Sequence, residues 1–226
     1  MMDEMNRAAR LTGLAYLGIA VSAFVGTLWI RPQLYAAGDA VATAANLVAH
    51  EGLARVGIAA DITMVLTQCL AALYFFKLFR GVSLFAAGSL AAFAFMNGVV
   101  GLVSVTFSAA ALTEALGGAA SAPANTLVLY RLTDAVWDAG QVFFGLWLIP
   151  MGWLVLRSGF ASRVLGWLLI VGGVGYIIST YLDFLFAVGD TVATALIVPA
   201  TIGEFWMIGH LLSKGVRSRS ARVAVD

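Results

Sequence analysis

The sequence predicts an all-α integral membrane protein, a bundle of six transmembrane helices with both termini in the cytoplasm. Three observations support this class: the composition, six apolar segments of about 20 residues, and a one-sided distribution of basic residues. Of 226 residues, 62% are hydrophobic and 11% are charged, with a mean hydropathy of +0.95. Soluble domains average about 25% charged and about 45–50% apolar residues. The composition is therefore that of a chain embedded in a bilayer.

Six apolar segments are long enough to cross a hydrocarbon core of about 30 Å. The expected spans form a single transmembrane domain over residues 1–226 and cover 11–30, 53–79, 84–112, 127–156, 164–183 and 192–212. The first span follows basic residues, as the apolar part of a signal peptide does, but it is too long for one. We expect it to remain in the protein.

A short amphipathic helix is predicted in the first outer loop, between the first two spans. Asp39 is a suitable N-cap residue, and the helix should run from there to His50. Gly52 is expected to end it. Its apolar face should consist of Val41, Ala44, Ala45 and Val48.

The basic residues predict the orientation. Ten of the 13 Lys and Arg residues lie on one side of the predicted spans: Arg7, Arg10, Lys77, Arg80, Arg157, Arg163, Lys214, Arg217, Arg219 and Arg222. The opposite side holds Arg31, Arg55 and Arg131. Because cytoplasmic loops are enriched in Lys and Arg, both termini should be cytoplasmic.

The fourth span carries a polar stripe. At about 100° per residue, Arg131, Asp134, Asp138 and Gln141 fall within one third of the helix circumference, and Gly145 continues the stripe. An ionised Asp at the centre of a membrane helix costs roughly 2.5–3.5 kcal/mol on the insertion scale. We therefore expect this stripe to face protein or water.

Two further acids lie within spans. Asp61 is in the second span, and Glu204 is in the sixth, about 15 Å from its cytoplasmic end at about 1.5 Å per residue. The sequence predicts that Asp61, Asp138 and Glu204 converge on an acidic pocket open to the non-cytoplasmic side. The alternative is an outer-surface ion pair with Arg131 at headgroup level.

Proline and glycine also suggest features of the spans. Pro150 and Pro199 each remove one helical hydrogen bond, which predicts either a kink or an interrupted helix beside a polar site. Gly172, Gly173 and Gly175 lie within the fifth span, where small residues allow close helix packing.

Several functional classes find no support in the sequence. The formal net charge of +1 offers no electrostatic footprint for nucleic acid, and a single cysteine, Cys69, excludes an intrachain disulfide. His50 and His210 are predicted on opposite sides, so they cannot share a zinc ion. We found no motif for a catalytic metal, a nucleophilic serine or a bound cofactor. Membrane lipids are the expected partners, and the sequence does not indicate an oligomeric state.

Three stretches together resemble an uncharacterised bacterial membrane family, domain of unknown function 4386. They are GDAVATAANLVAHEGLARVGIAADI (38–62), DAGQVFFGLWLIPMGWLVLRSGFASRVLGWLLIVGGVGY (138–176) and PATIGEFWMIGHLLSKG (199–215). The resemblance implies a compact six-helix protein of the bacterial cytoplasmic membrane, with no activity to transfer. It marks Asp61, Asp138, Gly145 and Glu204 as candidate positions. Similar sequences often carry a His where this chain has Trp147, so a His-dependent role is not expected here.

Three functional hypotheses follow. The first is binding or transport of a small polar solute, a cation or a proton through an outward-opening acidic pocket. The second is an intramembrane enzyme that uses paired carboxylates for acid/base chemistry. The third is a scaffold or accessory subunit in which the charges only pair between helices. The candidate site residues are Asp61, Arg131, Asp134, Asp138, Gln141 and Glu204.

Overall fold

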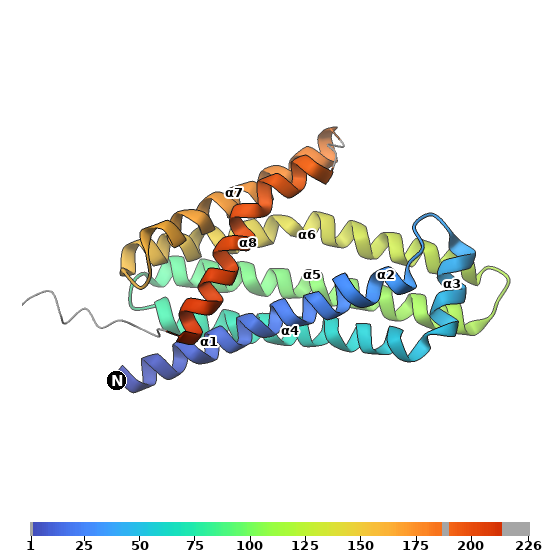
Figure 1. Ribbon diagram of the computed structural model, residues 1–226, viewed down its shortest axis with the longest axis horizontal. Coiled ribbons are helices and arrows are strands. Elements are labelled where there is room, and N and C mark those ends of the chain that lie inside the picture. Colours follow the sequence, from blue (N-terminus) through green and yellow to red (C-terminus); the bar gives the residue numbers. More distant parts are fainter. Residues whose placement is uncertain (1, 187–189, 214–226) are drawn as a thin grey trace, which may run out of the picture. The chain divides into compact units, whose positions relative to one another are not determined.

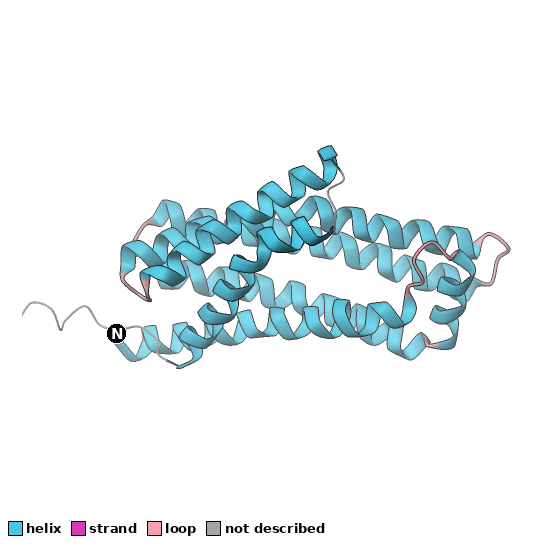
Figure 2. Ribbon diagram, turned by 45° about the horizontal axis from the view of Figure 1, so that its top comes forward, coloured by secondary structure: helices cyan, strands magenta, loops and turns pink. Residues whose placement is uncertain are grey.

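The computed structural model describes residues 2–186 and 190–213, and the described chain is helical apart from short connections (Figures 1 and 2). The elements in order are α1 (Met2–Ala23), η1 (Phe24–Ile30), α2 (Arg31–Leu34), α3 (Ala40–Ala49), α4 (Glu51–Phe79), α5 (Leu84–Gly117), α6 (Ala122–Ser158), α7 (Arg163–Phe186) and α8 (Asp190–Ser213). The basic tail residues Lys214, Arg217, Arg219 and Arg222 lie outside the described residues.

The six predicted spans are confirmed. Six described helical stretches are long and apolar enough to cross a membrane: Glu4–Leu34, Glu51–Phe79, Leu84–Gly117, Ala122–Ser158, Arg163–Phe186 and Thr191–Ser213. The first of them combines α1, η1 and α2. Each stretch extends beyond the predicted span at one end or both. Pro150 lies inside α6 and Pro199 inside α8, so neither proline ends its helix.

The chain forms two compact units. Among the described residues, unit 1 comprises 2–17, 69–95, 141–186 and 190–213, and unit 2 comprises 18–68 and 96–140. Helices α1, α4, α5 and α6 each contribute residues to both units. The prediction of one domain over 1–226 is not decided by this division.

Glycines allow close helix packing within unit 1. A Cβ on Gly172 would collide with the backbone of Ala200 in α8, and one on Gly175 would collide with the carbonyl oxygen of Leu196. A Cβ on Gly173 would likewise meet the carbonyl oxygen of Gly145 in α6. The predicted small-residue packing of α7, orange in Figure 1, is confirmed.

An aromatic cluster fills part of unit 1. Tyr16, Phe75 and Trp147 contact one another edge to face, with ring centroids 5.2–6.2 Å apart. All three side chains are buried. Edge-to-face pairs of this spacing are favourable beyond their buried area, so these rings tie α1, α4 and α6 together inside this unit.

Unit 2 has its own apolar core, to which α3 contributes. Ile30, Leu34, Leu47 and Leu112 are buried in this cluster. Figure 1 shows α3 running steeply across the direction of α2 and the start of α4. Asp39 caps α3 as predicted, since its carboxylate accepts a hydrogen bond from the backbone N–H of Ala42 at 2.9 Å.

Two details of α3 were predicted wrongly. The buried residues are Thr43, Ala44 and Leu47, whereas the exposed side includes Val41, Ala45 and Val48. Thr43 can be buried because its hydroxyl group donates to the carbonyl oxygen of Asp39 at 2.8 Å. The helix ends at Ala49, one residue before the predicted His50, and Gly52 does not stop it because α4 already begins at Glu51.

Candidate functional site

A pocket of about 140 Å³ lies within unit 2, with walls from η1, α2, α3, α4, α5 and α6. Its charged groups are one guanidinium, that of Arg31, and two carboxylates, those of Asp61 and Asp134. The other polar or aromatic groups that line it are Thr27, Ser108, Tyr130, Thr133 and Trp137. The pocket therefore contains one more acidic than basic group, together with two aromatic residues.

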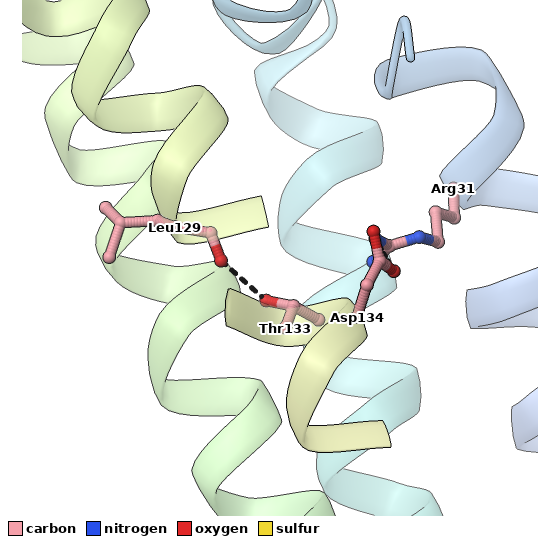
Figure 3. Close-up of polar contacts among 4 residues, drawn as sticks. All are labelled: Arg31, Leu129, Thr133 and Asp134. Atoms are coloured by element: carbon pink, nitrogen blue, oxygen red, sulfur yellow. Dashed lines mark hydrogen bonds and ion pairs between the residues drawn. The ribbon is translucent and has the colours of Figure 1, made fainter. Parts of the chain in front are cut away.

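Arg31 and Asp134 form an ion pair in this pocket. Arg31 Nη2 lies 2.5 Å from Asp134 Oδ1, and Figure 3 shows the two side chains meeting from α2 and α6. The Arg31 Cζ atom also lies 5.2 Å from the ring centroid of Tyr35 and 5.1 Å from that of Tyr130. A guanidinium group at this distance from an aromatic face is attracted to it. One carboxylate and two rings thus hold Arg31 in place.

The residues next to this ion pair are also fixed. The rings of Tyr35 and Tyr130 stack with centroids 5.2 Å apart and an interplanar angle of 3°. The hydroxyl group of Thr133 donates to the carbonyl oxygen of Leu129 at 3.1 Å, within α6 (Figure 3). These contacts order the wall around Asp134.

Asp61 is the second carboxylate of the pocket, and its contacts differ from those of Asp134. Among the described residues, none donates a hydrogen bond to Asp61 or forms an ion pair with it. It interacts electrostatically with Arg31, whose direct ion pair is with Asp134. A Cβ on Gly26 would lie 2.5 Å from Asp61 Oδ1, so the absence of a side chain there gives the carboxylate its space.

A π-helical segment shapes this side of the pocket. The backbone N–H of Arg31 donates to the carbonyl oxygen of Gly26, five residues earlier. Residues five apart lie about 140° apart around an ideal α-helix. A wider turn reduces this angle, and both residues line the pocket. Pro32 follows directly, and its missing N–H and its ring both oppose a regular α-helix through this point. Short π-helical segments frequently occur at functional sites.

Glu204 belongs to unit 1 and lies beside Tyr16. The buried Tyr16 hydroxyl group donates to Glu204 Oε1 at 2.7 Å. Trp147 contacts the Tyr16 ring, and its buried indole N–H has no hydrogen-bond partner among the described residues. Glu204 is therefore held within a largely aromatic cluster.

Three more of the predicted site residues do not line the pocket of unit 2. Arg131 and Asp138 have exposed side chains, and Gln141 is half-buried and belongs to unit 1. Of the predicted residues, Asp61 and Asp134 are the two that share this pocket. The convergence of Asp61, Asp138 and Glu204 on one vestibule stays a prediction.

Sequence reasoning missed several residues of these sites. Arg31 enters the sequence-based predictions only as a basic residue of the non-cytoplasmic side, and these predictions do not single out Tyr16, Tyr35 or Tyr130. The signal in the sequence that could have indicated Arg31 is its position directly before Pro32, at the end of an apolar span. Glu51 pairs with Arg55 one helical turn further on, at 2.6 Å.

The described residues contain no group of three or more His, Cys, Asp or Glu side chains placed to hold a metal ion. The ionisable groups of the pocket are instead two carboxylates and one guanidinium. This donor set suits a solute that carries positive charge or hydrogen-bond donors.

The fold defines a multi-pass helical membrane protein with a small charged pocket among its helices. The model of the family "Domain of unknown function (DUF4386)" matches residues 11–215, and the chain belongs to this family. The chain is also 38% identical over 64 residues to an uncharacterised protein of the archaeon Archaeoglobus fulgidus. That match covers 26% of this chain and 40% of the relative. No solved structure matches the chain. Because this relative is archaeal, a bacterial origin stays a prediction.

Proposed function

We propose that this protein binds a small, positively charged solute in the pocket of Arg31, Asp61 and Asp134. The observation that carries the proposal is that Asp61 has no direct partner for its carboxylate among the described residues. Its carboxylate lines the pocket without a hydrogen-bond donor or an ion-pair partner among the described residues, while Arg31 is already paired with Asp134. A bound cation would supply the partner that Asp61 lacks.

The charge balance supports a cationic ligand. When all three groups are ionised, two carboxylates and one guanidinium leave one uncompensated negative charge in the pocket. An unpaired charge is costly where helices and lipid replace water. Tyr130 and Trp137 line the same space, and an aromatic face turned toward a bound cation would attract it.

The volume limits the size of the ligand. A cavity of about 150 Å³ accommodates a molecule such as benzene, and the pocket measures about 140 Å³. An alkali cation with a few waters, or a small alkylammonium ion, is of suitable size. A drug-sized ligand, which needs a pocket of roughly 300 Å³ or more, is too large.

In a six-span membrane protein, such a pocket suits a transporter or a channel entrance. The distribution of basic residues predicts that the loop before α3 and the loop after α5 lie on the non-cytoplasmic side. With that orientation, the pocket would receive its solute from outside the cytoplasm. The π-helical turn beside it is an irregular backbone of the kind that membrane proteins tolerate next to a cavity.

Titration of the purified full chain in lipid nanodiscs tests the proposal. We expect methylammonium to bind and methanol, its neutral analogue, not to bind. The variant Asp61→Asn should weaken methylammonium binding by about tenfold or more, because a charge-assisted hydrogen bond is lost. Asp183→Asn, the same exchange in α7 of unit 1, should leave the affinity unchanged.

The competing explanation is a scaffold in which the Arg31–Asp134 pair only joins α2 to α6. Under that explanation the wild-type chain binds neither methylammonium nor an alkali cation, and Asp61→Asn changes stability alone. Binding that survives unchanged in Asp61→Asn would also refute the proposed site.

A further inference from the structure

A second and larger concave surface lies entirely within unit 1, and we call it the α4–α6 groove. It has a volume of about 690 Å³, within the usual range of about 300–1,000 Å³ for ligand sites. Its walls come from the end of α4, residues 81–83, the end of α6 and the residues just after it, with Met5 of α1 at one edge.

The floor of the groove is apolar. Leu78, Phe79 and Phe160 line it and are buried. The rings of Phe79 and Phe160 pack edge to face with centroids 5.6 Å apart. Phe160 in turn packs on His210, whose Nε2 lies 3.0 Å from the Phe160 carbonyl oxygen. The floor is therefore a fixed surface of hydrocarbon.

The rim of the groove is cationic. Arg157 is exposed, and its Cζ atom lies 5.3 Å from the ring centroid of Trp153, which lines the groove as well. Among the described residues, no carboxylate forms an ion pair with Arg157. Lys77, near the same end of α4, is by contrast paired with Glu4 at 2.9 Å. The guanidinium of Arg157 is thus available to an anion.

Two serine hydroxyl groups add polar contacts at the rim. Ser83 Oγ accepts the backbone N–H of Ala86 at 3.3 Å, which leaves its own proton for an acceptor. Ser158 Oγ also lines the groove and donates to the carbonyl oxygen of Val155 at 3.3 Å. An anion with several oxygen atoms could use Arg157 and Ser83 together.

The groove lies at the ends of membrane spans. Phe79 ends one candidate span, Leu84 begins the next and Ser158 ends a third. Leu84 and Phe85, directly after the wall at 81–83, have side chains that are 68% and 86% exposed. Exposed apolar side chains next to an arginine and a tryptophan are typical of the boundary between acyl chains and headgroups.

We infer that the α4–α6 groove binds the headgroup of an acidic phospholipid. Its phosphate would contact Arg157, and its acyl chains would run along the start of α5. A free phosphate ion would satisfy the charge but would leave Leu84 and Phe85 uncovered. Basic pockets between helices at a membrane surface are suited to anionic lipid headgroups. The inference is independent of the cation pocket in unit 2.

Native mass spectrometry of the full chain, with phosphatidylglycerol or phosphatidylcholine added, tests this inference. We expect a preferred first phosphatidylglycerol adduct, weakened about tenfold in Arg157→Gln and retained in Arg157→Lys. Val82→Asp, which places a carboxylate in the groove wall, should weaken the same adduct by charge repulsion. Arg163→Gln, an exposed basic residue at the start of α7 that does not line the groove, is the matched control.

Three results would overturn the inference. One is an unchanged phosphatidylglycerol adduct in both Arg157→Gln and Val82→Asp. Another is an equal loss in Arg163→Gln, which would indicate attraction to basic charge in general. The third is displacement of the lipid by millimolar inorganic phosphate, which would show that the groove recognises the phosphate group alone.

Discussion

The central prediction concerns Arg31. Its guanidinium group forms an ion pair with Asp134 of α6 and interacts electrostatically with Asp61 of α4. Replacing Arg31 with methionine keeps an unbranched, flexible stem that ends where Nε of arginine lies, and removes the guanidinium group with its charge. The Arg31 side chain is 21% exposed and that of Asp134 is 43% exposed. The coupling should therefore fall between that of exposed pairs, about 0.2–1 kcal/mol, and the 3–5 kcal/mol cost of breaking a buried pair. We expect a coupling of about 1–2 kcal/mol between Arg31 and Asp134.

The total effect of Arg31→Met should be larger than this coupling. The variant also loses two cation–π contacts, each worth about 0.5–1 kcal/mol when partly exposed. It leaves Asp61 and Asp134 in one pocket without a cation. We therefore expect a loss of about 2–3 kcal/mol in the free energy of unfolding. Adding Asp61→Asn to Arg31→Met should then restore about 1 kcal/mol, because one uncompensated carboxylate is removed.

Reversible unfolding of the full chain in mixed micelles, followed by tryptophan fluorescence, measures these differences. Arg55→Met is the control, since Arg55 pairs with Glu51 on the exposed surface of the same unit and should cost only about 0.3–0.5 kcal/mol. Two results would refute the reasoning. Either Arg31→Met costs no more than Arg55→Met, or Asp61→Asn has the same effect with and without Arg31.

Two further predictions follow from the two units. Gly26→Ala should push the Asp61 carboxylate away and abolish methylammonium binding in the titration, whereas Gly52→Ala, where a Cβ meets nothing within 4 Å, should preserve it. Tyr16→Phe should lower the free energy of unfolding by about 1–3 kcal/mol, because Glu204 loses its hydrogen-bond donor. The same variant should leave methylammonium binding intact, and a binding loss there would contradict the assignment of the cation site to unit 2.

The spans could be predicted from sequence because their signal is local. An apolar run of about 20 residues must form a helix in lipid, since every backbone group needs an internal partner. The cap at Asp39 is equally local, because it depends on residues within one turn. Both features can be predicted without any knowledge of tertiary contacts, and the structure confirms both.

The pairing of charges could not be predicted in this way. The polar stripe of α6 suggested Arg131 as the cation nearest to Asp134, but the cation that contacts Asp134 is Arg31, 103 residues away in sequence. Helical periodicity assigns a side chain to a face and says nothing about which helix lies opposite. The exposed position of Val41 and Val48 on α3 has a related cause. Apart from Thr43 and Asn46, every residue of α3 is apolar, so apolar spacing does not identify its buried side.

Helical periodicity also could not predict the π-helical turn of η1, whose residues form part of the pocket wall. Gly26 and Arg31 both line the pocket, and the turn between them spans five residues instead of four. In a regular α-helix the guanidinium would point about 140° away from Gly26. Gly26 supplies space for Asp61, while Arg31 supplies charge for Asp134. Two residues of one segment thus contact two different acids, and Asp61 remains the carboxylate with which a ligand would pair.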